Sequence, residues 1–373
     1  MIYLDSGATT LQKPDQVAKA VQKAMECCAN PGRGGHHPAR EAERIVYGCR
    51  EEAAELFGLD RPERVVFTQN ATHSLNLAVK SILHEGGHAV ITGYEHNSVV
   101  RPLEAMKEQG VCYTAVSSRL FDPADMARQM EQAIRPDTRC MIVCHMSNVF
   151  GSIAPLEELD RICLRHNLPM IVDASQSAGV LPLSAERYAS AAFFCMPGHK
   201  GLYGPQGTGL LICCKDNKLY TLLEGGTGSQ SLEEKQPDFL PDMMESGTLN
   251  VPGIAGLWEG LKFIRRQGQG ELLRWEQELV GELVQRLEGE RAIRLFSGGD
   301  RQGGVLSAVL SMPSEEAAEK LASQGICVRA GLHCAPLAHR TAGTLPDGTV
   351  RLSVSAFNTR KEMAETAAFL AKM

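Results

Sequence analysis

The stretch AAFFCMPGHKGLYGPQG, residues 191–207, joins an apolar run to a glycine-rich turn that carries Lys200. Residues Ala191–Met196 are apolar on both faces of an extended chain, which is typical of a strand buried in a parallel sheet. Gly198 and Gly201 flank the lysine and allow the backbone to approach a ligand closely. The stretch therefore predicts a buried strand followed by a ligand-binding turn.

Five other short apolar runs have the same character, and helical patterns separate them. Runs such as MIVCH and MIVDA are again apolar on both faces, so we predict an α/β fold with a central, mostly parallel sheet covered by helices on both sides. The further candidate strands are Val65–Thr68, His88–Thr92, Cys140–His145, Pro169–Asp173 and Gly209–Cys213, and the clearest candidate helices are His73–Leu83, Pro123–Ile134 and Leu156–His166.

The length of 373 residues exceeds that of one ordinary domain. Beyond residue 253 the pattern changes to a long helical region, Ile254–Leu287, followed by glycine-rich turns and a shorter α/β segment. We therefore predict a large domain over residues 15–253 and a smaller α/β domain formed by residues 1–14 and 254–373.

The composition excludes several classes of protein. A net charge of -6 with no long run of Lys and Arg argues against a nucleic-acid surface. No apolar stretch approaches the ~20 residues of a membrane span, and Asp5 comes too early for a signal peptide, so a cytoplasmic enzyme is expected. The twelve cysteines include no CxxC pair and no Cys/His set at zinc spacing. No metal site is predicted, and most of the thiols are expected to be reduced and buried.

Polar residues that follow the candidate strands are the candidate site, because ligands of open α/β sheets lie beyond the carboxyl ends of the strands. Asp173 closes the run MIVD and either pairs with a buried cation, such as a protonated pyridine nitrogen, or caps a turn. Lys200 either attacks a carbonyl from a desolvated position or is simply solvated. His96 either lies on a flat ring and carries protons or is an ordinary loop histidine.

A phosphate site is predicted at the start of TQNATHSLNLAV, which resembles a strand, a turn and a helix N-terminus. The backbone N–H groups of Ala71 and Thr72 and the hydroxyl of Thr72 would meet an anion there, although ordinary helix capping fits the same pattern. Asn148 and Gln176 add neutral hydrogen-bonding groups after two further strands. Together these residues supply the parts that pyridoxal 5'-phosphate (PLP) needs.

Eight motifs spread over nearly the whole chain carry a resemblance to a known family. With them the chain resembles the class V aminotransferase family of PLP enzymes, fold type I, and more narrowly its cysteine desulfurase and selenocysteine lyase branch. The GHK lysine with the upstream VDxxQ marks the family, and RxGxHCA marks the branch. The motifs are YLDSGATTLQKP, EHNS, HMSNVFG, VDASQSAG, GHKGLYGPQG, ESGTLNVPGIAG, VRAGLHCAPLAHR and VRLSVSAFNT.

The resemblance implies a role for each residue of the cofactor site. It implies a Schiff base between PLP and Lys200, an ion pair of Asp173 with the pyridine nitrogen, and His96 stacked on the ring. It also implies that Thr248 completes the phosphate site of the other subunit, and hence a homodimer. The remaining implied contacts are Gln176 and Asn148 at the ring hydroxyl edge, and Thr72 and His199 at the phosphate.

The resemblance further implies how L-cysteine is bound and its sulfur removed. Arg351 would hold the substrate carboxylate by a bidentate pair, with Asn148 nearby and Arg329 assisting at the cysteine loop. Arg33 is assigned to the site of the partner subunit. Cys334 would accept the sulfur as a persulfide, and either His333 or Arg329 would raise the thiolate fraction of its thiol, because the thiolate is the attacking form. Either Lys200 or His96 would move the α proton of the substrate.

Four positions depart from the family pattern. Pro197 stands where a phosphate-binding serine is common, and Leu249 where a proline often follows GT. Leu332 replaces the first histidine of HHC, and His73 replaces an acidic residue after Thr72. These departures concern the phosphate cradle and the activation of the thiol.

Other functions remain compatible with the same residues. A selenocysteine lyase shares the RxGxHCA loop, and another class V aminotransferase would need no thiol. A catalytically idle, sulfur-binding regulatory homologue would keep the fold alone. The sulfur acceptor is open, with an iron–sulfur scaffold among the candidate partner proteins.

Overall fold

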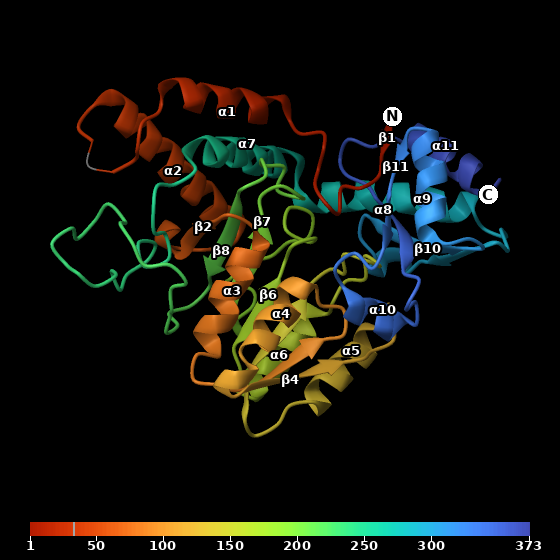
Figure 1. Cartoon of the computed structure of the whole chain (residues 1–373), viewed down its shortest axis with the longest axis horizontal. Helices are drawn as coiled ribbons and strands as arrows, with labels where there is room; N and C mark the ends of the chain where they lie inside the picture. The colour runs from red at the N-terminus through yellow and green to blue at the C-terminus, as the bar shows by residue number, and fades with distance from the viewer. Residues whose placement is uncertain (33) are drawn as a thin grey trace.

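The computed structural model describes residues 1–32 and 34–373. Its larger sheet is mixed but mostly parallel, and a layer of helices lies on each face (Figure 1). One strand alone runs antiparallel to both of its neighbours. In spatial order the strands are β2 (Val65–Thr68), β8 (Gly209–Cys213), β7 (Ala191–Pro197), β6 (Met170–Asp173), β5 (Thr138–Cys144), β3 (Gly87–Thr92) and β4 (Val111–Val116), and the antiparallel strand is β8.

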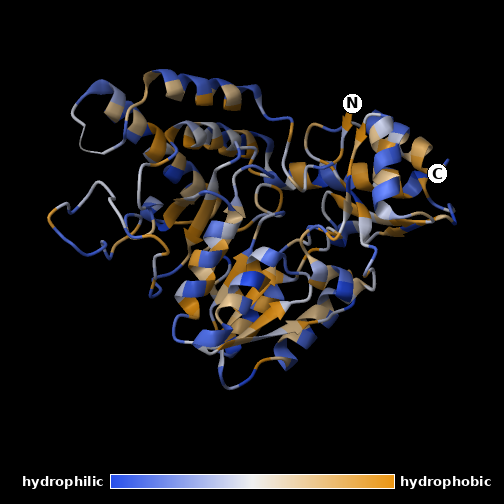
Figure 2. Cartoon of the chain, viewed as in Figure 1, coloured by the Kyte–Doolittle hydropathy of each residue, from blue (hydrophilic) through white to orange (hydrophobic). Residues whose placement is uncertain are grey.

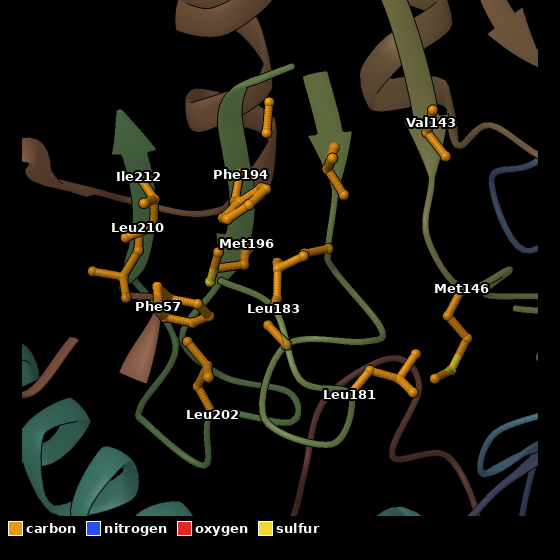
Figure 3. Packing of buried hydrophobic residues seen from close by; sticks show 14 of the residues in the cluster. Phe57, Val143, Met146, Leu181, Leu183, Phe194, Met196, Leu202, Leu210 and Ile212 are labelled. Carbon is orange, nitrogen blue, oxygen red and sulfur yellow. The ribbon is translucent and has the colours of Figure 1, made fainter. Parts of the chain in front are cut away.

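The central strands are buried on both faces because successive apolar side chains alternate between two cores. In β7, Phe194 and Met196 point into one core, while Phe193 and Cys195 belong to the other. Figure 3 shows Phe194 and Met196 beside Phe57 in the first core. The second core contains α3 (Ala71–Ile82) and α4 (Asn97–Ala105), and the first contains α1 (Asp15–Cys27), α2 (His37–Leu56), α5 (Pro123–Gln132), α6 (Leu156–Arg165) and α7 (Val251–Gln267).

A smaller domain with its own apolar core lies beside the large sheet, at the right of Figure 1. Figure 2 shows apolar residues concentrated in the strands of both domains and polar residues on the outer faces of the helices. The elements of the smaller domain are a four-stranded antiparallel sheet of β12 (Arg329–Gly331), β13 (Thr349–Ser353), β10 (Val305–Leu310) and β9 (Ile293–Phe296), the parallel pair β1 (Ile2–Tyr3) and β11 (Ile326–Cys327), and the helices α8 (Gln269–Arg286), α9 (Ser314–Ser323), α10 (Pro336–Ala342) and α11 (Arg360–Leu370).

The N-terminal segment links the two domains. Ile2 and Leu4 lie in the core of the smaller domain, and the chain then crosses to α1 on the large domain (Figure 1). The chain crosses between the domains a second time between α7 and α8. Helix α7 packs against α1 and α2, whereas α8 packs against α11. Gly268 separates the two helices and has a left-handed φ of 83°, which suits a helix stop. We therefore propose a domain boundary at Gly268 rather than at residue 253.

The predicted fold class is confirmed, and the bounds of the six predicted strands and three clearest helices agree with the structure within two residues. The sequence did not predict β4, which forms the sheet edge with four of its six residues only partly buried. Its apolar signal is correspondingly weak. Among the described residues, no helix combines the length and apolar character that a membrane crossing needs. The described residues also form three short 3₁₀ turns, Pro62–Arg64, Lys107–Gln109 and Gly299–Arg301.

Candidate active site

A cavity of about 220 Å³ lies between the carboxyl ends of the large sheet's strands and the smaller domain. Residues from both domains and from the N-terminal segment line it. The structure brings eleven of the thirteen predicted site residues to this cavity: Ala71, Thr72, His96, Asn148, Asp173, Gln176, His199, Lys200, Arg329, Cys334 and Arg351.

Lys200 and Asp173 follow the adjacent strands β7 and β6. Burial lowers the pKa of the Lys200 amine to about 8, and the charge of Arg351 acts in the same direction, while Asp173 opposes it. One carboxylate oxygen of Asp173 accepts hydrogen bonds from the backbone N–H of Ser175, at 2.9 Å, and from its hydroxyl. The pair thus combines a reactive amine with a buried carboxylate held in one orientation.

His96 caps the start of α4. Its Nδ1 accepts from the backbone N–H of Ser98 at 3.0 Å, which places the proton of the neutral ring on Nε2. Burial lowers the pKa of the His96 imidazole to about 4 although Asp173 raises it. The ring is therefore neutral near pH 7. The hydroxyl of Ser98 lies 2.8 Å from the Thr72 hydroxyl and connects His96 to the start of α3.

The N-terminus of α3 opens into the cavity through Ala71 and Thr72. Asn70 caps this helix by accepting from the N–H of His73 at 3.0 Å, which leaves the other N–H groups of the first turn without an intrahelical partner. His199 lies on the same cavity wall with its Nδ1 3.0 Å from the Thr9 hydroxyl. Burial lowers the pKa of His199 to about 4, so it acts as a neutral hydrogen-bonding group. This end of the cavity suits an anion.

Two neutral side chains of the cavity are already engaged within the protein. Gln176 donates through Nε2 to the carbonyl of Gly7 at 2.8 Å. Asn148 donates through Nδ2 to the carbonyl of His333 at 2.9 Å, while its Oδ1 is buried without a hydrogen-bond partner among the described residues. Since an unsatisfied buried acceptor is costly, Asn148 is placed to accept a hydrogen bond from a ligand.

Cys334 lies on an exposed loop that the smaller domain presents to the cavity. His333 and Cys334 have left-handed φ values of 49° and 56°, which non-glycine residues rarely adopt. Two hydrogen bonds hold this loop on the large domain. The Cys334 carbonyl accepts from the N–H of Asn97 at 2.8 Å, and the His333 carbonyl accepts from Asn148.

His333 does not supply a positive charge to the neighbouring thiol. Its ring is buried with Nε2 3.2 Å from the carbonyl of Thr349. Burial, aided by Arg351, lowers the pKa of His333 to about 2, so the ring stays neutral. Arg329, the other predicted candidate, lies on the cavity wall.

The two arginines of the cavity differ in their partners. Arg351 is only 2% exposed and forms an ion pair with Asp5, with 2.6 Å between Nη2 and Oδ1. Its Nη1 donates to the carbonyl of Asn148 at 3.1 Å. Arg329 is exposed and has no carboxylate within ion-pair distance in the part of the chain that the structure describes. The predicted carboxylate-binding residue is therefore already paired.

The two remaining predicted site residues lie elsewhere. Thr248 is exposed and lines two other surface pockets, one of them beside residues 30–32. Its role in the site of another subunit stays a prediction. Arg33 lies outside the described residues.

Sequence reasoning missed three residues that line the cavity or hold one of its side chains. Ser98 connects His96 to Thr72, and a serine two residues after a capping histidine was the available signal. Asp5 and Gly7 lie in the motif YLDSGATT, to which no role was given. A Cβ at Gly7 would lie 3.3 Å from Cζ of Arg351, so a side chain there would crowd the guanidinium.

Comparisons with known proteins agree with this geometry. The chain matches the aminotransferase class-V family over residues 2–365. A probable cysteine desulfurase of Methanothermobacter thermautotrophicus is 30% identical over 97% of this chain and 92% of its own length. Another, of Halalkalibacterium halodurans, is also 30% identical and matches 100% of this chain and 93% of its own length. The apo structure of a cysteine desulfurase from Thermococcus onnurineus NA1 superposes with a TM-score of 0.92 at 29% identity, covering 100% of this chain and 94% of that one.

Proposed function

Because the chain belongs to the aminotransferase class-V family and, within it, to the cysteine desulfurases, we propose that it uses PLP to convert L-cysteine to L-alanine and carries the released sulfur on Cys334. The observation that carries this proposal is that Lys200 of the large domain and Cys334 of the smaller domain line one cavity. An amine that binds an aldehyde cofactor and a nucleophilic thiol then reach the same substrate.

The family is PLP-dependent, and the residues of the cavity fit this cofactor. Lys200 would hold its aldehyde carbon, Asp173 its pyridine nitrogen and His96 the face of its ring. The start of α3 at Thr72 offers N–H groups and a hydroxyl to a phosphate. The unsatisfied Oδ1 of Asn148 offers an acceptor inside the same cavity. When bound, PLP withdraws electrons from the amino acid joined to it, which makes the α proton removable.

Lys200 is better suited than His96 to move the α proton of the substrate. A general base works best when its pKa lies near the working pH. Burial leaves the Lys200 amine with a pKa of about 8, whereas the pKa of His96 falls to about 4. We therefore assign proton transfer to Lys200 and a flat, neutral contact surface to His96.

Cys334 would complete the reaction as a nucleophile. Its thiolate attacks the sulfur of the bound cysteine, a sulfur–sulfur bond forms and the carbon–sulfur bond breaks. The electron pair of the broken bond stays with the carbon, which takes up a proton, so alanine leaves and Cys334 holds a persulfide.

The assembly and the partners belong to the same proposal. The exposed position of Thr248 suits a residue that reaches the phosphate site of a second copy, so we propose a homodimer. Arg351 would bind the substrate carboxylate, and the exposed Cys334 would pass its sulfur to an acceptor protein.

The test is anaerobic incubation of the PLP-loaded protein with L-cysteine, followed by mass measurement of its peptides. The peptide that bears Cys334 is expected to gain one sulfur atom, and alanine is expected in equal amount. C334A is expected to lose sulfur release while it keeps the absorbance of the bound cofactor. C112A, which removes a partly buried thiol outside the cavity, serves as the control. Full sulfur release by C334A would rule out the role of this cysteine.

A further inference from the structure

The guanidinium of Arg351 is committed to partners of the protein itself. Its Nη2 pairs with Asp5, its Nη1 donates to the carbonyl of Asn148, and its Nε is buried without an acceptor among the described residues. A carboxylate ligand needs two adjacent N–H groups for a bidentate pair. Both bidentate edges of a guanidinium include Nη2, one together with Nε and the other with Nη1, so any such ligand must share Nη2 with Asp5.

The carboxylates of Asp5 and of a ligand do not both bind favourably at Nη2 of Arg351. Like charges at one guanidinium repel each other, and the repulsion is strong where Arg351 is removed from water. A substrate carboxylate that binds Arg351 therefore displaces the carboxylate of Asp5.

Asp5 can release Arg351 without movement of the backbone around it. The backbone of Asp5 pairs with Ser353, and the next residues are fixed by hydrogen bonds between Gly7 and both Ser353 and Gln176. The Asp5 side chain keeps 21% of its surface exposed, so a rotamer change moves its carboxylate towards water. The segment then stays in place while the side chain leaves.

We propose that Asp5 is a built-in competitor of the substrate, which occupies Arg351 in the empty site and is replaced by the carboxylate of the amino acid. The proposal rests on the proposed function, because it assigns the substrate carboxylate to Arg351. It makes Asp5 a residue that sets the affinity for carboxylate ligands. A ligand without a carboxylate does not compete with Asp5.

The test measures binding of 3-mercaptopropionate to the PLP-loaded protein by calorimetry. This probe has the carboxylate and the thiol of cysteine but no amine, so it is not turned over. D5N and D5A are expected to bind it about three- to tenfold more tightly than the wild-type protein, as expected for removal of a competing, partly exposed ion pair. D347N is the matched control, since it removes one negative charge from the same domain outside the cavity, and it is expected to bind like the wild type.

A second probe separates competition from a general change of the site. 2-Mercaptoethylamine keeps the thiol and the amine but lacks the carboxylate, and its affinity is expected to be equal in D5N and the wild type. Unchanged or weaker binding of 3-mercaptopropionate to D5N would overturn the proposal, because Asp5 would then only orient Arg351. Loss of the D5N effect in an R329A background, but not in R351A, would overturn it as well. Absence of sulfur release from cysteine leaves these binding results intact, so the two failures are distinguishable.

Discussion

One wall of the cavity, the sheet wall, carries Asp173 and Lys200 and is built from the ends of buried strands. A second wall, the loop wall, carries Cys334 and is a loop of the smaller domain. Every residue of β6 and β7 is buried, so packing on both faces holds the sheet wall in place. The loop wall depends on two residues with left-handed φ and on two hydrogen bonds to the large domain, made by Asn97 and Asn148.

The two walls also differ in the burial of their titratable and charged side chains. Burial keeps His96 neutral on the sheet side and brings the pKa of Lys200 down to about 8. On the loop side, Cys334 and Arg329 are exposed. The contrast separates a rigid wall at the strand ends from a loop that presents Cys334 to both the cavity and the solvent.

The largest effect is expected from K200A, which removes the reactive group of the sheet wall. Sulfur release from cysteine should fall by at least about a thousandfold. Covalent attachment of the cofactor after borohydride reduction, followed by mass measurement of the Lys200 peptide, should be lost as well. C334A provides the comparison, since it should lose sulfur release and keep the attachment. Equal attachment in K200A would mean that another residue supplies the reactive amine, and it would contradict the assignment of cofactor attachment to the sheet wall.

The same contrast explains which parts of the molecule the sequence predicts. The sheet wall follows from runs such as MIVD and AAFFCM, because buried parallel strands leave a strong local signal and their ends meet at one edge. The pairing of Arg351 with Asp5 and the docking of the Cys334 loop on Asn97 join residues far apart in the chain. Neither leaves a local pattern, so only the structure shows them.

A smaller effect is expected from N97P, which loosens the loop wall alone. Asn97 is the first residue of α4, where proline fits a helix, and the extended backbone of His96 suits a residue before proline. The change removes the N–H that binds the Cys334 carbonyl. Sulfur release should fall several-fold, while cofactor absorbance stays unchanged.

The control for N97P is N97A, which keeps the N–H group. The rate of Cys334 alkylation by iodoacetamide should rise in N97P and stay at the wild-type value in N97A, because a released loop exposes its thiol more often. Identical alkylation and sulfur release in both variants would mean that this hydrogen bond does not hold the loop.

The smallest effect on the chemistry is expected from E95Q, which tests the sheet wall through stability. Glu95 is fully buried and accepts from the Thr92 hydroxyl and from the N–H of Cys144, contacts that a glutamine oxygen can keep. Burial, together with the charge of Asp173, raises the pKa of Glu95 to about 8, above the value of about 4.3 expected in the unfolded chain. Between these pH values the unfolded state has released a proton that the folded state keeps, so stability falls as the pH rises.

A glutamine does not titrate, so E95Q removes this difference in proton binding between the folded and the unfolded state. Its free energy of unfolding, measured by urea denaturation from pH 5 to pH 9, should therefore improve relative to the wild type as the pH rises towards 8, by up to about 1.4 kcal/mol per pH unit, and level off above it. E108Q changes an exposed carboxyl and should follow the wild-type curve. Parallel curves for E95Q and the wild type would show that Glu95 is ionised in the folded protein. The carboxylates of Glu95 and Asp173 would then repel each other within the sheet wall, and the packing of that wall would have to outweigh this repulsion.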